Sequence, residues 1–156
     1  MSNINNYIIT DDQDKSGTRL VIDEIVKNLF SAFTNKGKIK INLDIIRRIF
    51  IQQGIIIKNI GDTSEIYTID EFIQPREELL NSGSLLDFEE EELTAQTIIT
   101  GNIAQRISVY HKKGTLSGKE FYTKGVKNIQ FIKTADGWKI NSLTWDDERD
   151  GLKISG

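Results

Sequence analysis

Apolar residues recur with a helical period in the first third of the chain. Between Thr18 and Lys36 they form one stripe, at Ile22, Ile25, Val26, Leu29, Phe30 and Phe33. Spacings of three and four residues put these side chains on one face of a helix. Such a helix is marginal by itself in water, so its stripe has to pack on a core, and Lys36-Gly37 predicts its C-terminal end.

Two shorter helices are predicted next. Asn42 is a suitable N-cap for a helix that carries Leu43, Ile46 and Phe50 on one side and ends at residues 52–54. Residues 55–57 and 65–69 then predict a small β-hairpin. Thr68 and Glu71 have the spacing of a capping box, which predicts a third helix from residue 69 to 81. Pro75 lies inside it and predicts a kink or a restarted turn, because proline lacks the backbone donor.

After Gly83 the apolar positions alternate, which is typical of strands. Four strands are predicted, at residues 85–100, 103–113, 121–134 and 138–146. The breaks at residues 101–102, 114–118 and 136–137 are short and contain glycine, so consecutive strands should be antiparallel. Helices followed by a four-stranded meander predict an α+β fold. We expect one domain over residues 1–156, with residues 1–10 as a flexible polar tail.

The length of the strands suggests a curved sheet. The longest has about 16 residues, against a usual length near five or six. Long antiparallel strands twist and coil, so the sheet should wrap around the helices as a cone with a hollow at its wide end. Gly101, Gly114, Gly118 and Gly125 stand where bends or bulges would help that curvature.

Composition narrows the class of protein. The chain has 156 residues, 38% of them apolar, no cysteine and a net charge of −3. These values exclude a disordered chain, a disulfide scaffold and a thiolate metal site. The apolar runs are too short to span a bilayer, and 20 Lys and Arg against 23 Asp and Glu argue against a nucleic-acid binder. The first ten residues lack the features of a secretory signal, so a cytoplasmic location is expected.

Several short motifs resemble one known superfamily. They are Glu71-Phe72-Ile73 with Arg76, Phe88 with Glu90 and Glu92, Gly101 to Gln105, Ser108 with Tyr110, Gly125-Val126 with Gln130, Asp136 to Ile140, and Trp145-Asp146. Together with the order of the elements, they resemble the nuclear-transport-factor-2-like superfamily, and its uncharacterised bacterial members most closely. This group includes ketosteroid isomerase, scytalone dehydratase and the SnoaL-like polyketide cyclases.

The resemblance implies a conical α+β fold, a pocket inside the cone and a homodimer joined through the sheet. It transfers no catalytic residue, because the sequence has no matching catalytic motif at a recognisable position. It implies no reaction either, since this fold hosts enzymes, binding proteins and assembly domains alike. We expect no cofactor and no metal.

The strand around the single histidine leaves two alternatives open. His111 shares a face with Ile103, Gln105, Ile107 and Val109, whereas Arg106 and Tyr110 lie on the other face. If the aliphatic face packs on the first helix, His111 lies at the rim of the hollow, and Arg106 and Tyr110 belong to a dimer surface. In the opposite arrangement, Arg106 and Tyr110 line the pocket.

Further candidate ligand contacts lie on neighbouring elements. Asn128 and Gln130 share one face of the next strand, where two amides would orient a polar group. Trp138 and Trp145 differ by seven positions and should face opposite sides, with Trp138 in the core and Trp145 in the pocket wall or a dimer contact. Phe33, near the end of the first helix, is within reach of the hollow.

Acidic residues cluster on the first long strand, at Asp87 and at Glu89 to Glu92. Alternate positions of a strand face opposite sides, which separates these carboxylates and disfavours a metal cage. A solvated strand edge that discourages aggregation is the predicted role.

Three functions remain after these exclusions. The preferred one is a dimeric protein that binds a small apolar or partly polar molecule. The second is an isomerase, dehydratase or cyclase that acts on a carbonyl compound by acid–base chemistry. The third is an association module that uses Arg106, Tyr110 and Gln130.

Overall fold

The computed structural model describes residues 17–155, so the predicted tail at residues 1–10 lies outside the described part. Its helices are α1 (Thr18–Ser31), α2 (Asp44–Ile49) and α3 (Ile69–Asn81). Its strands are β1 (Phe50–Lys58), β2 (Glu65–Thr68), β3 (Leu85–Thr100), β4 (Ile103–Leu116), β5 (Lys119–Thr134) and β6 (Gly137–Asp147). They form one six-stranded sheet in the order β2-β1-β6-β5-β4-β3, so the α+β prediction is confirmed.

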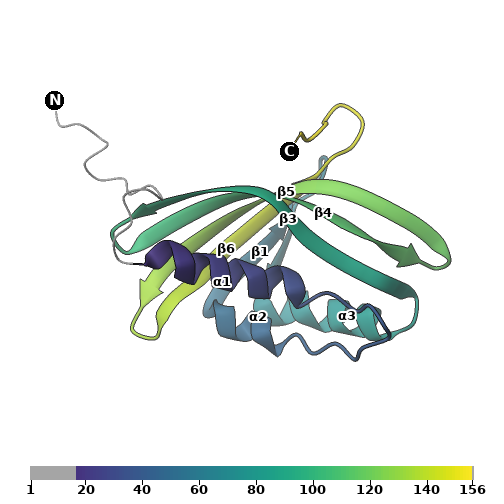
Figure 1. The fold of residues 1–156 in the computed structure, drawn as a ribbon, viewed down its shortest axis with the longest axis horizontal. Helices are drawn as coiled ribbons and strands as arrows, with labels where there is room; N and C mark the ends of the chain where they lie inside the picture. Colours follow the sequence, from purple (N-terminus) through teal and green to yellow (C-terminus); the bar gives the residue numbers. More distant parts are fainter. Residues whose placement is uncertain (1–16, 156) are drawn as a thin grey trace.

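The sheet is strongly curved, and the three helices lie on one side of it (Figure 1). We call the face toward the helices the inner face; it carries Tyr110, Lys127 and Trp145. The opposite, outer face carries Ile107, Asn128 and Gln130. The buried apolar residues of the helices and of the inner face form one continuous core, as the predicted cone requires.

Helix α1 buries the predicted stripe. Ile22, Val26 and Leu29 are at most 3% exposed. The helix ends at Ser31, five residues before the predicted end, and Phe33 lies in the turn that follows. Phe33 is still buried in the core, so the periodicity located the right face and misplaced only the helix end.

The prediction for the second helix was wrong at its C-terminal end. Helix α2 stops at Ile49, and Phe50 to Gln53 belong to β1. The start of α2 is also one residue later than predicted, because the N-cap is Leu43 and not Asn42; the Asn42 amide oxygen accepts a hydrogen bond of 2.8 Å from the Asp44 backbone N–H. Apolar residues continue without a break from the helix into the strand, which hides the boundary from a periodicity argument.

Helix α3 has the predicted capping box. The Thr68 hydroxyl accepts from the Glu71 N–H at 3.2 Å, and the Glu71 carboxylate accepts from the Thr68 N–H at 3.1 Å. The helix continues through Pro75 to Asn81 and does not restart there. Within residues 17–155, none of the helices has the length and apolar character needed to cross a membrane.

The four predicted strands form the predicted antiparallel meander, and the sheet extends beyond them. Strand β1 pairs in parallel with β6 and antiparallel with β2, which gives a mixed sheet. The turn between β4 and β5 is shorter than predicted: it consists of Ser117 and Gly118, with φ values of 49° and 83°. Positive φ at both central residues suits the right-handed twist of a hairpin.

An irregularity in β6 corrects the prediction for the two tryptophans. Phe131 pairs with Ile140 and Gln130 pairs with Ser142, so Asn141 is an extra residue in β6. One extra residue shifts the alternation by one position. Trp138 and Trp145 are therefore both buried, with Ile140 and Leu143 between them. They do not face opposite sides, as the count of seven positions had predicted.

Candidate functional site

A chamber of about 400 Å³ lies between the helices and the inner face of the sheet. Ligand sites usually have volumes of about 300–1,000 Å³. Side chains of α1, α3 and all strands except β2 contribute to its wall. The apolar members are Leu29, Phe33, Ile56, Phe72, Leu79, Leu80, Leu85, Phe88, Leu116, Phe121, Leu143 and Trp145.

Five charged side chains interrupt this apolar wall. They are Lys58, Arg76, Glu90, Lys112 and Lys127. The strands place them there by simple alternation: Lys127 lies between Gly125 and Ile129 on the inner face of β5, and Glu90 follows Phe88 on β3. Charges at core positions are costly unless they are paired, so their partners decide what this site can do.

Lys127 is the most enclosed of these charges. Its side chain is 8% exposed, and its Nζ lies 3.9 Å from the centre of the Tyr110 ring, where a cation–π contact forms. The nearest carboxylate oxygen in its ion pair belongs to Glu90, at 3.9 Å, which is too long for a hydrogen bond. Burial lowers the pKa of Lys127, and the neighbouring Lys112 and Arg76 lower it further, against the opposing effect of Glu90 and Asp147.

A buried tyrosine–carboxylate pair supports the floor beneath Lys127. The Tyr110 hydroxyl donates to Asp147 at 2.6 Å, and Lys112 donates to the other oxygen of the same carboxylate at 2.9 Å. Burial, followed by the charge of Asp147, raises the pKa of Tyr110, so the phenol keeps its proton and acts as a donor. Gly125 makes room for this pair, because a Cβ there would lie 2.3 Å from the Asp147 oxygen.

Arg76 enters the chamber from α3. Its guanidinium carbon lies 3.9 Å from the centre of the Phe72 ring, and Nη1 donates to the Phe72 carbonyl at 3.3 Å. Burial lowers the pKa of Arg76, with smaller opposing effects from Tyr67, Glu90 and Glu65. A guanidinium remains charged in proteins under ordinary conditions, so Arg76 brings a permanent positive charge to the wall.

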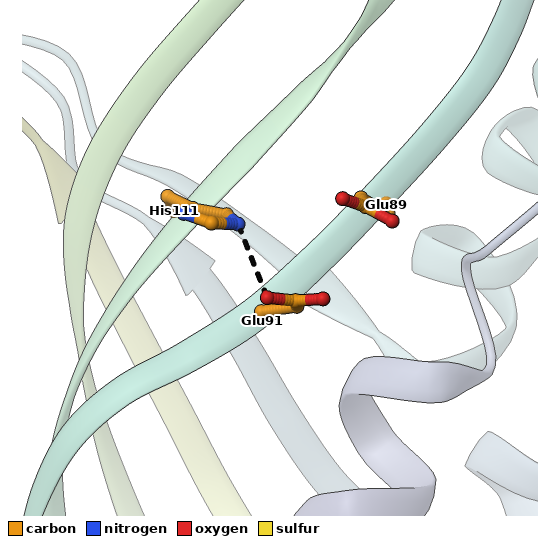
Figure 2. Close-up of side chains that lie close together, drawn as sticks. All are labelled: Glu89, Glu91 and His111. Carbon is orange, nitrogen blue, oxygen red and sulfur yellow. Dashed lines mark ion pairs between the residues drawn. The ribbon is translucent and has the colours of Figure 1, made fainter.

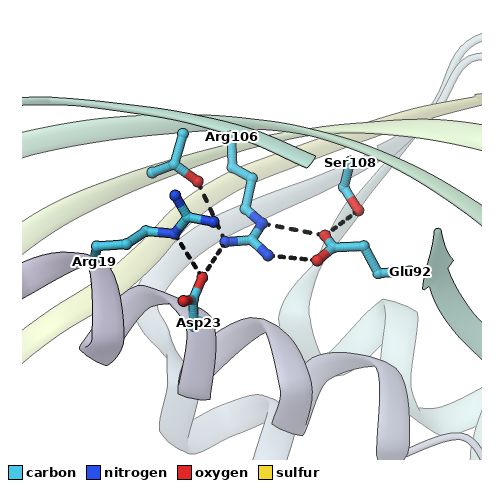
Figure 3. Close-up of polar contacts among 6 residues, drawn as sticks. Arg19, Asp23, Glu92, Arg106 and Ser108 are labelled. Carbon is cyan, nitrogen blue, oxygen red and sulfur yellow. Dashed lines mark hydrogen bonds and ion pairs between the residues drawn. The ribbon is translucent and has the colours of Figure 1, made fainter. Parts of the chain in front are cut away.

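Arg106 belongs to a separate ionic network, which joins α1 to the sheet (Figure 3). Its Nε donates to Glu92 at 3.1 Å, its Nη2 pairs with the same carboxylate, and its Nη1 donates to Asp23 at 2.6 Å. Ser108 also donates to Glu92, and Arg19 donates to Asp23 at 2.7 Å. Because these groups satisfy one another, Arg106 serves to attach α1 and is not in the chamber wall.

The structure separates the candidate residues into three groups. Phe33 and Trp145 line the chamber. Arg106 and Tyr110 lie on the inner face outside the chamber wall, with 5% and 0% of their surface exposed. His111, Asn128 and Gln130 lie on the outer face and do not reach the chamber. The arrangement with the aliphatic face of β4 packed on α1 is therefore wrong, since Ile103 and Ile107 are exposed.

Sequence reasoning missed Lys58, Arg76, Glu90, Lys112 and Lys127. The sequence did contain one indication: Lys127 lies in the middle of its strand, at an alternate position that continues with the apolar Ile129 and Phe131. Glu90 was attributed to a solvated edge together with its neighbours. That interpretation was wrong for Glu90 and Glu92, which turn inward, and for Glu89, which is 7% exposed.

A group of possible metal ligands lies elsewhere, on β3 and β4 (Figure 2). It consists of Glu89, Glu91 and His111, each of which offers one ligand atom within 4.8 Å of the other two. His111 Nε2 lies 3.6 Å from Glu91. Both oxygens of Glu89 are already used, by Lys36 and by Lys113 at 3.0 Å. Two lysines beside the cluster oppose a divalent cation, so these residues give no support for a metal site.

Comparisons with known proteins bear on the fold. No protein-family model and no curated protein matches this sequence. Solved structures do match. A nuclear transport factor 2-like superfamily protein from Salmonella enterica is 11% identical, with a TM-score of 0.68 over 92% of this chain and 99% of that one. A putative ketosteroid isomerase from Shewanella frigidimarina is 22% identical, with a TM-score of 0.57 over 84% and 95% of the two chains.

A third similar structure comes from Exiguobacterium sibiricum and is described as a putative Ca/calmodulin-dependent kinase II association domain. It is 7% identical, with a TM-score of 0.66 over 91% of this chain and 98% of that one. Identities this low show shared architecture, and one architecture can carry many functions. The helix order, the curved sheet and these structural matches lead to one conclusion: this chain has the nuclear transport factor 2-like fold.

Proposed function

We propose that this protein binds a small, largely apolar molecule in the chamber between its helices and the inner face of its sheet. The observation that carries the proposal is a partly open cavity of about 400 Å³ whose wall includes Phe33, Phe72 and Trp145. Apolar surface that lines such a space gains about 25 cal/mol per Å² when a ligand removes it from water. Concave, mostly apolar sites with a few polar groups are the usual form of small-molecule sites.

The two tryptophans allow a direct test, because Trp145 lines the chamber and Trp138 does not. A Trp138→Phe variant has Trp145 as its only tryptophan, and Trp145→Phe is the matched control. The probe is uncharged 10-bromodecan-1-ol, whose bromine quenches tryptophan fluorescence on contact. We expect saturable quenching in Trp138→Phe and weak, unsaturable quenching in Trp145→Phe. Equal quenching of the two variants would remove the chamber as the binding site.

A second candidate is the acid–base enzyme, and the position of Glu90 favours it. Glu90 is a carboxylate in the wall of an apolar chamber, where such a group is suited to moving a proton next to a carbonyl. The structure also contains a tyrosine that donates to a carboxylate, Tyr110 to Asp147. Neither residue lines the chamber, so this pair does not supply Glu90 with a donor partner.

Proton exchange tests this second candidate without knowledge of the substrate. β-Tetralone, an apolar ketone, exchanges its α-protons in D₂O at a rate that NMR measures. An enzyme of this kind speeds the exchange at least tenfold over buffer, and Glu90→Gln removes the effect while it keeps the shape of the side chain. Two results would count against the enzyme: exchange with the wild type that is no faster than in buffer, or exchange with Glu90→Gln that is as fast as with the wild type.

We propose further that the outer face of the sheet joins two copies of the chain. Ile103, Ile107 and Tyr122 are about half exposed there, at 58%, 48% and 54%. Large apolar side chains that stay exposed on a sheet face are candidates for a contact between copies. Of the three residues that the association-module hypothesis named, only Gln130 lies on this outer face. Arg106 and Tyr110 are buried on the inner face.

A further inference from the structure

The charges of the chamber wall are strongly unbalanced. Four cations, Lys58, Arg76, Lys112 and Lys127, meet one carboxylate, Glu90, although the chain as a whole has a net charge of −3. Asp147, behind the wall, pairs with Lys112 at 2.9 Å. Even with Asp147 included, the cations outnumber the carboxylates by two.

Two of these cations have hydrogen-bonding capacity left. Arg76 makes no ion pair with a carboxylate of residues 17–155 within 4.0 Å; its guanidinium donates to the Phe72 carbonyl at 3.3 Å and has the Tyr67 hydroxyl as a neutral side-chain partner. The pair between Lys127 and Glu90 is 3.9 Å long, so the ammonium is attracted to Glu90 without donating to it. Buried cations without close counter-ions are unfavourable by several kcal/mol, which a bound anion would offset.

Both cations approach the same aromatic ring. The guanidinium carbon of Arg76 lies 5.7 Å from the centre of the Trp145 ring, and Lys127 Nζ lies 5.4 Å from it. A head group placed beside Trp145 would therefore be close to both. The planar guanidinium matches the two oxygens of a carboxylate, and the ammonium supplies further donors.

We infer that the ligand is an amphipathic acid, whose carboxylate binds Arg76 and Lys127 beside Trp145 and whose apolar body lies against Phe33 and Leu143. This inference rests on the proposed function, because it names the chemical class of the molecule that the chamber binds. Glu90, 3.9 Å from Lys127, adds a negative charge that disfavours a dianion such as a phosphate monoester. A singly charged carboxylate suits the remaining excess of positive charge better.

A matched pair of probes separates this inference from the proposed function. The probes are 10-bromodecanoate and 10-bromodecan-1-ol, which share the apolar chain and the quenching bromine and differ only in the charged head. Both are titrated into the full chain with Trp138→Phe at pH 7, with Trp145 as the reporter. We expect the carboxylate to bind at least tenfold more tightly than the alcohol.

The same titrations in Arg76→Met and in Lys127→Met locate the head group. Either substitution should reduce the preference for the carboxylate over the alcohol, the ratio of their two dissociation constants, at least fivefold. Lys133→Met, an exposed position on the same strand, is the control and should keep the preference. Circular dichroism checks the fold, and Arg76→Gln replaces Arg76→Met if the latter does not fold.

Three results would overturn the inference. If the alcohol binds as tightly as the carboxylate, the chamber binds apolar molecules without recognising an acid, and only the proposed function survives. If the carboxylate is preferred in both Arg76→Met and Lys127→Met, the head group is bound elsewhere. If neither probe quenches Trp145 in the folded protein, the proposed function fails together with the inference.

Discussion

Lys127 is held by aromatic rings more than by counter-charge. Its ammonium lies within 5.5 Å of the ring centres of Phe30, Tyr110 and Trp145, while Glu90 is its ion-pair partner at 3.9 Å. Burial is the largest cause of its lowered pKa. The protonated form is therefore less favourable in the folded chain than in the unfolded chain, where the ordinary value is 10.5. A residue that reduces stability in the unliganded protein is expected where a ligand has to be recognised.

This gives a prediction for stability and its pH dependence. Burial makes the Lys127 charge unfavourable, and Glu90 offsets it only from 3.9 Å, without accepting a hydrogen bond. Lys127→Met should therefore raise the free energy of unfolding at pH 7. As the pH rises toward 10.5, the folded wild type releases the Lys127 proton before the unfolded chain does, so the wild type gains stability relative to the variant.

Urea unfolding of both proteins between pH 7 and pH 10.5 measures this difference. The comparison with Lys127→Met removes the contributions of groups that do not interact with Lys127. An advantage of the variant that shrinks with rising pH agrees with the structure. A variant that is destabilised by several kcal/mol at pH 7 would show that Lys127 is a well-compensated structural ion pair.

Helix α1 is attached to the sheet by its apolar stripe and by Arg106. The guanidinium bonds Glu92 on the neighbouring strand and Asp23 on the helix, and its own side chain is 5% exposed. Removal of one partner from a buried ionic group leaves the others uncompensated. The network joins the sheet to α1, so its loss should weaken the attachment of the helix that lies over the chamber.

Arg106→Ala should reduce the free energy of unfolding by about 3–5 kcal/mol, as for other buried ion pairs. The matched control is Arg47→Ala. Arg47 also bonds two carboxylates, those of Asp44 and Asp70, but its side chain is 46% exposed. Its removal should therefore change stability by less than about 1 kcal/mol. Similar losses in the two variants, measured by urea unfolding, would contradict the structural role assigned to Arg106.

Most elements could be predicted from the sequence, because their periodicity is strong. The stripe of α1, the capping box of α3 and the long alternating strands all persist in the structure. The boundary between α2 and β1 could not be predicted, since apolar residues run across it. The faces of Trp138 and Trp145 were missed because one extra residue, Asn141, shifts the alternation in β6. A single sequence does not reveal such a bulge.

The candidate site was harder to predict than the fold. Phe33 and Trp145 could be placed near the hollow from their positions, but the choice of sheet face depended on register across strands. Once β4 and β5 are paired, Ile107 lies opposite Asn128 on the outer face, and His111 lies opposite Lys124. The cations of the wall come from four different elements, so their convergence is a property of the folded chain.

At the scale of the whole molecule, the two faces of the sheet have different roles in this account. The inner face closes the chamber, and the outer face carries the exposed Ile103 and Ile107. If the outer face joins two copies, Ile107→Glu should convert a dimer to a monomer, because it places a charge in the proposed contact. Sedimentation equilibrium measures the change.

The control for this prediction is Leu20→Glu, which adds the same charge at an exposed leucine of α1, away from the sheet. This variant should have the mass of the wild type. A wild type that is monomeric at 100 μM, or a dimer that Ile107→Glu leaves intact, would rule out the outer face as the contact between copies.

The proposed function requires that a small molecule occupies the chamber between the helices and the inner face of the sheet. A crystal structure of the protein, grown with 10-bromodecanoate and phased on its bromine, tests this most directly. We expect one bromine site inside the chamber and continuous density from Phe33 to Trp145, with the carboxylate near Arg76 and Lys127. A chamber filled by its own side chains, with bromine bound only at the surface, would contradict it.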